Sequence, residues 1–206
     1  MSFGDLFGWM GGVIFVARLV PQPWRLFRHR SRAGVSWLGT ANAMVSTTGW
    51  FIYGVGVGEP VLWVPSLVAL VPEAATVALL GWRPPSRRDA LVCAGWAVLV
   101  LAAWPLGGRI ALGVVIGVGI VAGVVPHVVT VLRSADVHGV ARRTWQIALV
   151  DAALWGAYSI PAREPMTGFY AIVLGTGAAV ILWRLHRADA SEAPPLGPVG
   201  VHSYDV

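Results

Sequence analysis

Three ionisable residues, Arg18, Glu73 and Asp151, lie inside long apolar stretches of the sequence. A charged side chain inside a bilayer is costly, so it usually pairs with an opposite charge or lines a passage for a solute. Arg18 and Glu73 are each about twelve residues from the expected outer end of their helices, or roughly 18 Å deep at 1.5 Å per residue. We therefore expect an intramembrane ion pair between them. Asp151 has no evident partner and is a candidate for carrying a proton.

Two stretches of the sequence place polar and aromatic residues on one face of a helix. The spacings of four, four and three residues bring such side chains onto a single face. They occur at Asn42, Ser46, Trp50 and Tyr53, and again at Ile147, Asp151, Trp155 and Tyr158. A stripe that is polar in its middle and aromatic toward its outer end suits the wall of a cavity. Tyr53 and Tyr158 also fit the alternative of anchors at the membrane–water interface.

The composition excludes several other kinds of chemistry. Hydrophobic residues make up 56% of the 206 residues and charged residues only 12%, which is typical of an integral membrane protein. The single cysteine, Cys93, has no partner at metal-ligand spacing, and no nucleophile–base pair or phosphate loop is present. We expect no enzyme activity, cofactor or metal. The net charge of +5 does not indicate nucleic-acid binding, because all 15 basic residues are arginines in short clusters between apolar runs.

The apolar runs predict seven membrane-spanning helices and their orientation. A span needs about 20 apolar residues, and the candidates are 6–27, 34–57, 60–82, 89–106, 109–132, 143–160 and 165–185. Twelve arginines flank one side and two flank the other. Because basic residues stay in the cytoplasm, we expect a multi-pass protein of the cell inner (cytoplasmic) membrane, with the N-terminus outside and the C-terminus cytoplasmic. Residues 188–206 are polar and Pro-rich and predict a disordered tail.

The chain also contains an internal repeat. Shifting the sequence by 105 positions aligns residues 8–60 with a second copy at sixteen identical positions, including Trp50 with Trp155 and Glu59 with Glu164. An all-α membrane fold with a 3+1+3 arrangement follows: a first three-helix bundle over 1–86, an inverting helix over 87–107 and a second bundle over 108–187. Parallel repeats of this kind are typical of transporters whose substrate binds between the halves. A duplicated membrane protein without transport activity is the alternative.

Several motifs within this repeat resemble the PQ-loop superfamily. The first helix ends in Pro21-Gln22, Gly34-Val35-Ser36 opens the second helix, and Trp50-x-x-Tyr53 closes it. The second copy has Pro126-His127 and Trp155-x-x-Tyr158. With the 3+1+3 topology, residues 8–185 are similar to the SWEET transporters, whose half-sized relatives are the SemiSWEETs.

This resemblance implies roles for the matched residues. Pro21, Gln22 and Pro126 would belong to the segments that hinge, and Tyr53 and Tyr158 to the extracellular gate. Trp50 and Trp155 would pack on a sugar ring, with Asn42, Ser46, Ser66 and Asp151 as further candidates for binding the substrate. Relatives that transport sugars carry an Asn in the third helix of the bundle, where this chain has Ser66 and Ala171. A smaller or less hydroxylated substrate would fit this departure.

The expected function is therefore SWEET-like transport of a small polar solute, most simply a sugar, by alternating access between two repeats. Some PQ-loop relatives couple the export of amino acids to protons, so a proton-coupled carrier of amino acids or other polar metabolites is the alternative. A receptor with the same architecture is a third possibility. The lipid bilayer and the solute are the expected partners, and association into a homo-oligomer stays open.

Overall fold

The computed structural model describes residues 3–29, 35–84, 86–134, 137, 140 and 142–192, and the regular structure among these residues is helical. The helices are α1 (Phe3–Leu19), α2 (Pro21–His29), α3 (Trp37–Val57), α4 (Pro60–Leu80), α5 (Arg87–Arg133), α6 (Arg142–Ala162) and α7 (Pro165–Glu192). Four stretches are long and apolar enough to cross a membrane by length and composition: Phe3–Arg28, Pro60–Leu80, Arg87–Arg133 and Pro165–Asp189.

Local sequence signals explain where the central helices begin and end. The side chain of Ser36 caps α3 by accepting a hydrogen bond from the Gly39 amide at 3.1 Å. Gly58 ends α3 in the left-handed conformation, with φ of 76°, which glycine adopts without a steric penalty. Pro60 then opens α4, where its missing amide hydrogen costs nothing. The tight link between α3 and α4 therefore follows directly from Gly58-Glu59-Pro60.

Two breaks divide the longer apolar runs. The helix from Phe3 stops at Leu19, and Pro21 starts the short helix α2. Within α5 the backbone leaves the helical region at Gly107 and Gly108, so α5 consists of two helices joined by a kink. Gly108 has φ of 59° and ψ of −149°, a region open almost only to glycine. The kink falls between residues 106 and 109, where two of the predicted spans meet.

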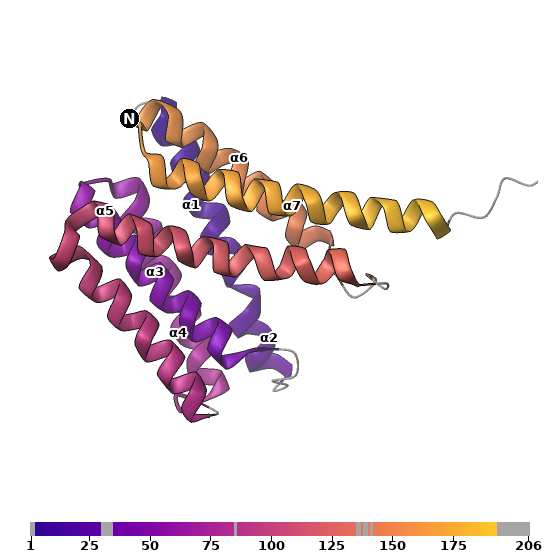
Figure 1. The fold of residues 1–206 in the computed structure, drawn as a ribbon, viewed down its shortest axis with the longest axis horizontal. Helices are drawn as coiled ribbons and strands as arrows, with labels where there is room; N and C mark the ends of the chain where they lie inside the picture. The colour runs from indigo at the N-terminus through magenta and orange to yellow at the C-terminus, as the bar shows by residue number, and fades with distance from the viewer. Residues whose placement is uncertain are drawn as a thin grey trace, which may run out of the picture.

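The helices pack as two bundles of the same internal order. In the first, α4 lies between α1 and α3; in the second, α7 lies between α6 and the second half of α5. The bundles meet through α1 against α6 and through α3 against α5 (Figure 1). Each bundle therefore places its third helix between the first and the second. The first helix of each bundle also packs against the second helix of the other bundle.

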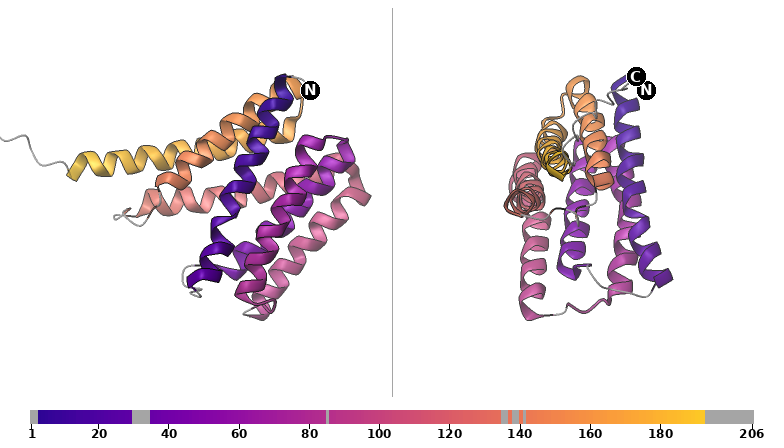
Figure 2. Two further views of the ribbon diagram at one scale, coloured as in Figure 1. Left: turned by 180° about the vertical axis from the view of Figure 1, so that it is seen from behind. Right: turned by 90° about the vertical axis from the view of Figure 1, so that its right-hand side faces the viewer.

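The two bundles diverge toward one end of the molecule, as Figure 1 and the left view of Figure 2 show. We call this end, which carries the arginine-rich links, the inner end, and the opposite end with the N-terminus the outer end. Helix α7 runs on to Glu192, so the prediction of a disordered tail is wrong for residues 188–192. The remaining part of that predicted tail, 193–206, lies outside the described residues.

Glycines let α1 approach both bundles closely. A Cβ atom added at Gly8 would lie 2.3 Å from Val61 of α4 and 2.8 Å from Tyr158 of α6. One added at Gly12 would lie 2.4 Å from the ring of Pro65. Small residues give such close approaches in membrane helices. Helix α1 is therefore wedged between its own bundle and the other.

Candidate functional site

Three cavities follow one another between the bundles. The central one, which we call the chamber, has a volume of about 40 Å³ and is lined by Phe15, Trp50, Leu62, Pro65, Ser66, Trp155, Thr167 and Tyr170. An outer cavity of about 540 Å³ lies on one side, and an inner cavity of about 810 Å³ lies on the other. A buried water needs about 10–15 Å³ of such volume. The chamber thus has room for a few waters in this conformation.

Both predicted tryptophans line the chamber, one from each bundle. Trp50 on α3 makes edge-to-face contacts with Tyr53 and Tyr170, with ring centroids 6.0 and 6.1 Å apart. Trp155 on α6 makes the same kind of contact with Tyr158 at 5.8 Å. Such geometry favours aromatic pairs because the positive ring edge meets the negative face. The chamber wall is therefore a connected set of aromatic rings.

Of the polar residues Ser66, Ser46 and Asn42, which the sequence predicts to bind the substrate, only Ser66 lines the chamber. Ser66 lines the chamber, but its hydroxyl donates to the carbonyl of Leu62 at 2.7 Å. Ser46 accepts a hydrogen bond from the indole Nε1 of Trp96 at 3.0 Å, so it faces the first half of α5. Asn42 holds a buried Oδ1 atom without a hydrogen-bond partner and is not among the residues that line the chamber. The face of α3 that carries these residues therefore borders the chamber at Trp50, but α5 covers the part of it around Ser46.

At the outer end two tyrosine–glutamate pairs join the bundles. The Tyr53 hydroxyl donates to Glu164 Oε1 at 2.6 Å, and the Tyr158 hydroxyl donates to Glu59 Oε2 at 3.4 Å. The two pairs are related by the repeat, since Tyr53 matches Tyr158 and Glu59 matches Glu164. We call them the outer clasp. Tyr53 lines the outer cavity and contacts Trp50 in the chamber wall, so the clasp separates the two spaces.

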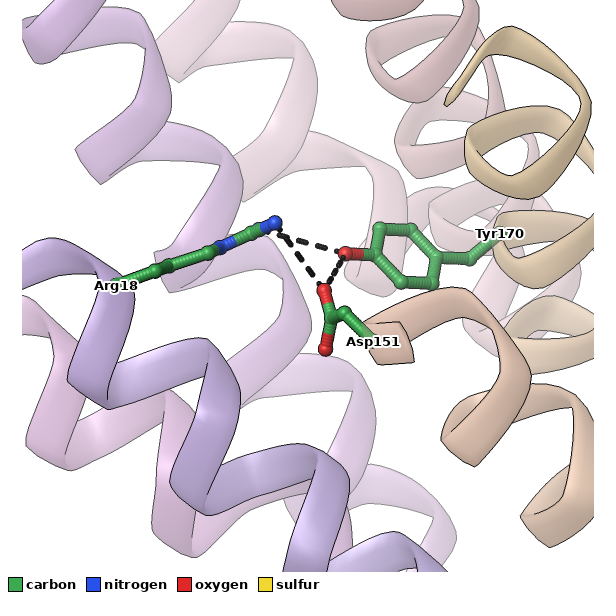
Figure 3. Close-up of polar contacts among 3 residues, drawn as sticks. All are labelled: Arg18, Asp151 and Tyr170. Atoms are coloured by element: carbon green, nitrogen blue, oxygen red, sulfur yellow. Dashed lines mark hydrogen bonds and ion pairs between the residues drawn. The ribbon is translucent and has the colours of Figure 1, made fainter. Parts of the chain in front are cut away.

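Toward the inner end a second set of contacts joins the bundles (Figure 3). Arg18 Nη1 lies 3.1 Å from Asp151 Oδ2, and Arg18 Nη2 donates to the Tyr170 hydroxyl at 3.3 Å. Tyr170 in turn donates to Asp151 Oδ2 at 2.7 Å. We call these three residues the charged triad. Tyr170 lines the chamber and Arg18 lines the inner cavity, so the triad stands between those two spaces.

The prediction that Arg18 pairs with Glu73 is wrong, because Arg18 pairs with Asp151 instead. Helix α1 packs against α6 as well as α4, and the Arg18 side chain turns to Asp151 of the second bundle. Glu73 instead accepts a hydrogen bond from Thr47 at 3.0 Å within the first bundle. Two residues at a similar depth in the membrane can still point in different directions around their helix axes, so depth alone does not identify the partner of Arg18. The expectation that Asp151 lacks a fixed partner is corrected by the same contact.

The three hinge candidates differ in their surroundings. Pro21 follows the break after α1 and lines the inner cavity. Gln22 lines a smaller cavity of about 220 Å³ together with Glu73. Pro126 lies inside α5, which continues to Arg133. The helix is therefore broken just before Pro21 but continues through its repeat partner, Pro126.

The sequence did not single out Tyr170, Glu59 or Glu164 as site residues. The two glutamates were visible as repeat identities, each six residues after its tyrosine. Their pairing across the bundles requires the packing of α3 against α5 and of α1 against α6, which the sequence alone does not supply. Tyr170 has Pro65 as its repeat partner, so the repeat gave no signal for it.

Comparisons with known proteins agree with this architecture. Residues 3–63 match the family described as the PQ loop repeat, and none of the curated proteins matches the chain. The fold is similar to the solved structure of a eukaryotic SWEET transporter, with a TM-score of 0.70 and 17% sequence identity, covering 92% of this chain and 100% of that one. The apolar helices and this fold indicate a multi-pass membrane protein. Residues 3–63 thus match the PQ loop repeat, and the chain as a whole has the fold of a SWEET transporter, which are the repeat and the fold that the motifs of the sequence predict.

Proposed function

We propose that the protein carries a small polar solute across a membrane by alternating access between its two three-helix bundles. One observation carries this proposal: contacts between the bundles stand on both sides of the chamber, the outer clasp on one side and the charged triad on the other. Hydrogen bonds and ion pairs of this kind form in one arrangement of two rigid bodies and break in another. A passage closed by two such sets can open at one end at a time.

The proposed topology has seven spans, with the outer end outside the cell and the inner end in the cytoplasm. The distribution of arginines supports it, because the inner links and the C-terminal flank hold twelve of the 15. Residues 1–86 and 108–187 would be the two moving units and residues 87–107 the helix that inverts the chain between them. The kink at Gly107 and Gly108 lies at the end of that helix. A bacterial inner membrane is the proposed location.

A sugar is the first candidate for the solute. Trp50 and Trp155 face the chamber from opposite bundles, and an aromatic ring can cover the apolar face of a pyranose. Ligand pockets commonly measure about 300–1,000 Å³, so the chamber would have to widen when the bundles move. This movement fits a carrier in which the aromatic rings separate to admit a solute.

A proton-coupled carrier of amino acids or other polar metabolites is the second candidate, and the charged triad favours it. The hydroxyls of Ser66 and Thr167 donate to the backbone carbonyls of Leu62 and Glu164, so their protons are not free for a sugar. Arg18 lines the inner cavity and offers charged donors instead. A neutral sugar has no need of such a group.

Uptake into proteoliposomes tests the carrier function. We would measure radiolabelled glucose, sucrose, lactate and a mixture of amino acids, with and without an inward proton gradient. Trp50→Ala and Trp155→Ala should each lower uptake about tenfold or more, which corresponds to about 1.4 kcal/mol. Trp82→Ala is the matched control, because this side chain is 64% exposed and lies away from the chamber. Uptake that is equal in all three variants, or absent for every solute, would contradict the proposal.

A further inference from the structure

We propose that the solute is a small monocarboxylate that crosses together with one proton, with Arg18 binding the carboxylate and Asp151 carrying the proton. This inference rests on the proposed carrier function and names the class of its substrate. It is carried by the charged triad, by the two cavities that meet there and by a buried carboxylate with incomplete hydrogen bonding.

Arg18 is placed to receive an anion. Its guanidinium contacts Asp151 and Tyr170, yet the side chain is 29% exposed and lines the inner cavity of about 810 Å³. Among the described residues around the chamber and the inner cavity, it is the one arginine, and the chain contains no lysine. A guanidinium has five N–H donors and binds carboxylates through two parallel hydrogen bonds. Thr144 and Gln146 on the same cavity add neutral polar groups.

Asp151 is placed to bind a proton rather than the solute. Its side chain is 0% exposed, and it belongs to the lining of neither the chamber nor the inner cavity. Its Oδ2 atom accepts a hydrogen bond from Tyr170 and pairs with Arg18, while its Oδ1 atom is buried without a hydrogen bond of normal geometry, and the Trp155 side chain is the remaining donor near this carboxylate. A carboxylate that is buried in a dry site with incomplete hydrogen bonding favours its neutral, protonated form, whichever oxygen holds the proton. The ammonium group of a zwitterion could not reach this carboxylate, which favours a monocarboxylate over an amino acid.

Tyr170 provides a route for the proton. Its hydroxyl is part of the chamber wall and donates to Asp151 Oδ2 at 2.7 Å. The hydroxyl can pass its proton to Oδ2 while it takes another from a hydronium ion in the chamber, which leaves a neutral tyrosine, a neutral carboxylic acid and one water. The chamber has room for a few waters.

Charge balance couples the two events. Arg18 and Asp151 together are neutral, and a net charge buried in a membrane protein is costly. A carboxylate that binds Arg18 while Asp151 is ionised would leave one negative charge uncompensated. Once Asp151 is protonated, Arg18 and the carboxylate form the neutral pair. Binding of the anion and uptake of the proton therefore favour each other, and the loaded carrier has the same charge as the empty one.

The other ionisable groups near the pair come from the remaining helices. Glu73 on α4 is buried, with its Oε1 atom bonded to Thr47 and its Oε2 atom, like Oδ1 of Asp151, without a hydrogen bond of normal geometry. His127 on α5 lies across the inner cavity with its ring against Trp145. Glu73 is the matched control for Asp151, because it is also a buried acid but its hydrogen bond is to Thr47 rather than Arg18. Glu73→Gln should leave proton coupling in place.

The test uses the full chain in proteoliposomes, with protein-free liposomes as the background. We would measure radiolabelled lactate, alanine and glucose under an inward gradient of one pH unit, with the membrane potential clamped by potassium and valinomycin. Lactate should accumulate about tenfold, because one coupled proton transfers the whole gradient to the solute. Changing the clamped potential should have no effect. The gradient should not stimulate alanine or glucose uptake.

Substitutions then separate the two roles. Asp151→Asn replaces the carboxyl by a neutral amide that cannot take up or release a proton. Gradient-driven accumulation should therefore be lost, while lactate–lactate exchange persists equally at pH 6 and pH 8. Arg18→Gln should lose both activities. Because a single change leaves one charge unpaired and can impair folding, the double variant Arg18→Gln with Asp151→Asn restores neutrality. It should fold and show no lactate transport.

Three results would overturn the inference. Glucose uptake that ignores the gradient and survives in the double variant would overturn it while leaving the carrier function standing. Gradient-driven alanine uptake that is lost in Asp151→Asn would replace the monocarboxylate with a zwitterion. An absence of transport for all three solutes, with correctly folded protein, would overturn both the inference and the carrier function.

Discussion

The outer clasp predicts that removing one hydroxyl group opens the outer end. In Tyr53→Phe the ring remains, and the hydrogen bond of 2.6 Å to Glu164 is lost. Both side chains are buried, with exposed fractions of 3% for Tyr53 and 8% for Glu164. As long as the outer end is closed, Glu164 would stay buried without this donor. When that end opens, water can hydrate Glu164. The substitution therefore destabilises the closed state relative to the open one.

The size of the shift follows from the strength of this bond. A hydrogen bond to a charged group contributes about 1.5–3 kcal/mol, and about 1.4 kcal/mol changes an equilibrium tenfold. Tyr53→Phe should therefore shift the population toward the outer-open state by about ten- to a hundredfold. Tyr158→Phe is the matched control, because its bond to Glu59 measures 3.4 Å and is weak at that length. Its shift should be about fivefold or less.

Accessibility of the chamber from outside measures this shift. We would replace the single cysteine by Cys93→Ala and introduce Thr167→Cys, a position that lines the chamber. The rate of labelling by a membrane-impermeant maleimide should rise about tenfold or more with Tyr53→Phe and much less with Tyr158→Phe. Equal labelling rates with and without Tyr53→Phe, or the reverse order of the two variants, would refute the assignment of the clasp as an outer gate.

Two further predictions concern packing and the backbone. Gly12→Ala should lower the melting temperature, because the added Cβ would lie 2.4 Å from the Pro65 ring; Gly95→Ala, which meets nothing within 4 Å, should raise helix stability by up to about 1 kcal/mol. Gly108→Ala should destabilise the protein by about 1–3 kcal/mol, because its φ of 59° and ψ of −149° strain any other residue. Thermal unfolding in detergent, followed by tryptophan fluorescence, checks both; a loss in Gly95→Ala or no loss in Gly108→Ala would contradict them.

The repeat and the lengths of the apolar runs were the most informative patterns in the sequence. Trp50 and Trp155 occupy matched positions on helices that face each other, and both line the chamber. The predicted spans 89–106 and 109–132 leave residues 107 and 108 between them, and the structure has its kink at these two glycines. Patterns of this kind depend only on spacing along one chain segment. They can therefore be recognised in the sequence without knowing how the helices pack.

Contacts between the bundles could not be predicted in the same way. Arg18 was assigned to a partner in its own bundle, but α1 also packs against α6, and the direction of the side chain around α1 decides which acid it meets. Ser46 is a second case, because it lies on the face of Trp50 yet contacts Trp96 of α5. Periodicity places a residue on a face, and only the packing of helices shows which neighbour covers that face.

The two ends of the passage differ in their relation to the repeat, and this difference bears on coupling. The outer clasp occurs twice because both copies retain the tyrosine and the glutamate. The charged triad occurs once: its repeat partners are Gly123, Ser46 and Pro65, and Ser46 is already bonded to Trp96. One bundle interface, α1 against α6, therefore holds an ion pair whose acid is fully buried, and the repeat-related interface between α3 and α5 has neutral residues at these positions. A symmetric carrier would offer two proton sites for each cycle. With a single triad, the mechanism proposed for Arg18 and Asp151 couples one proton to one solute.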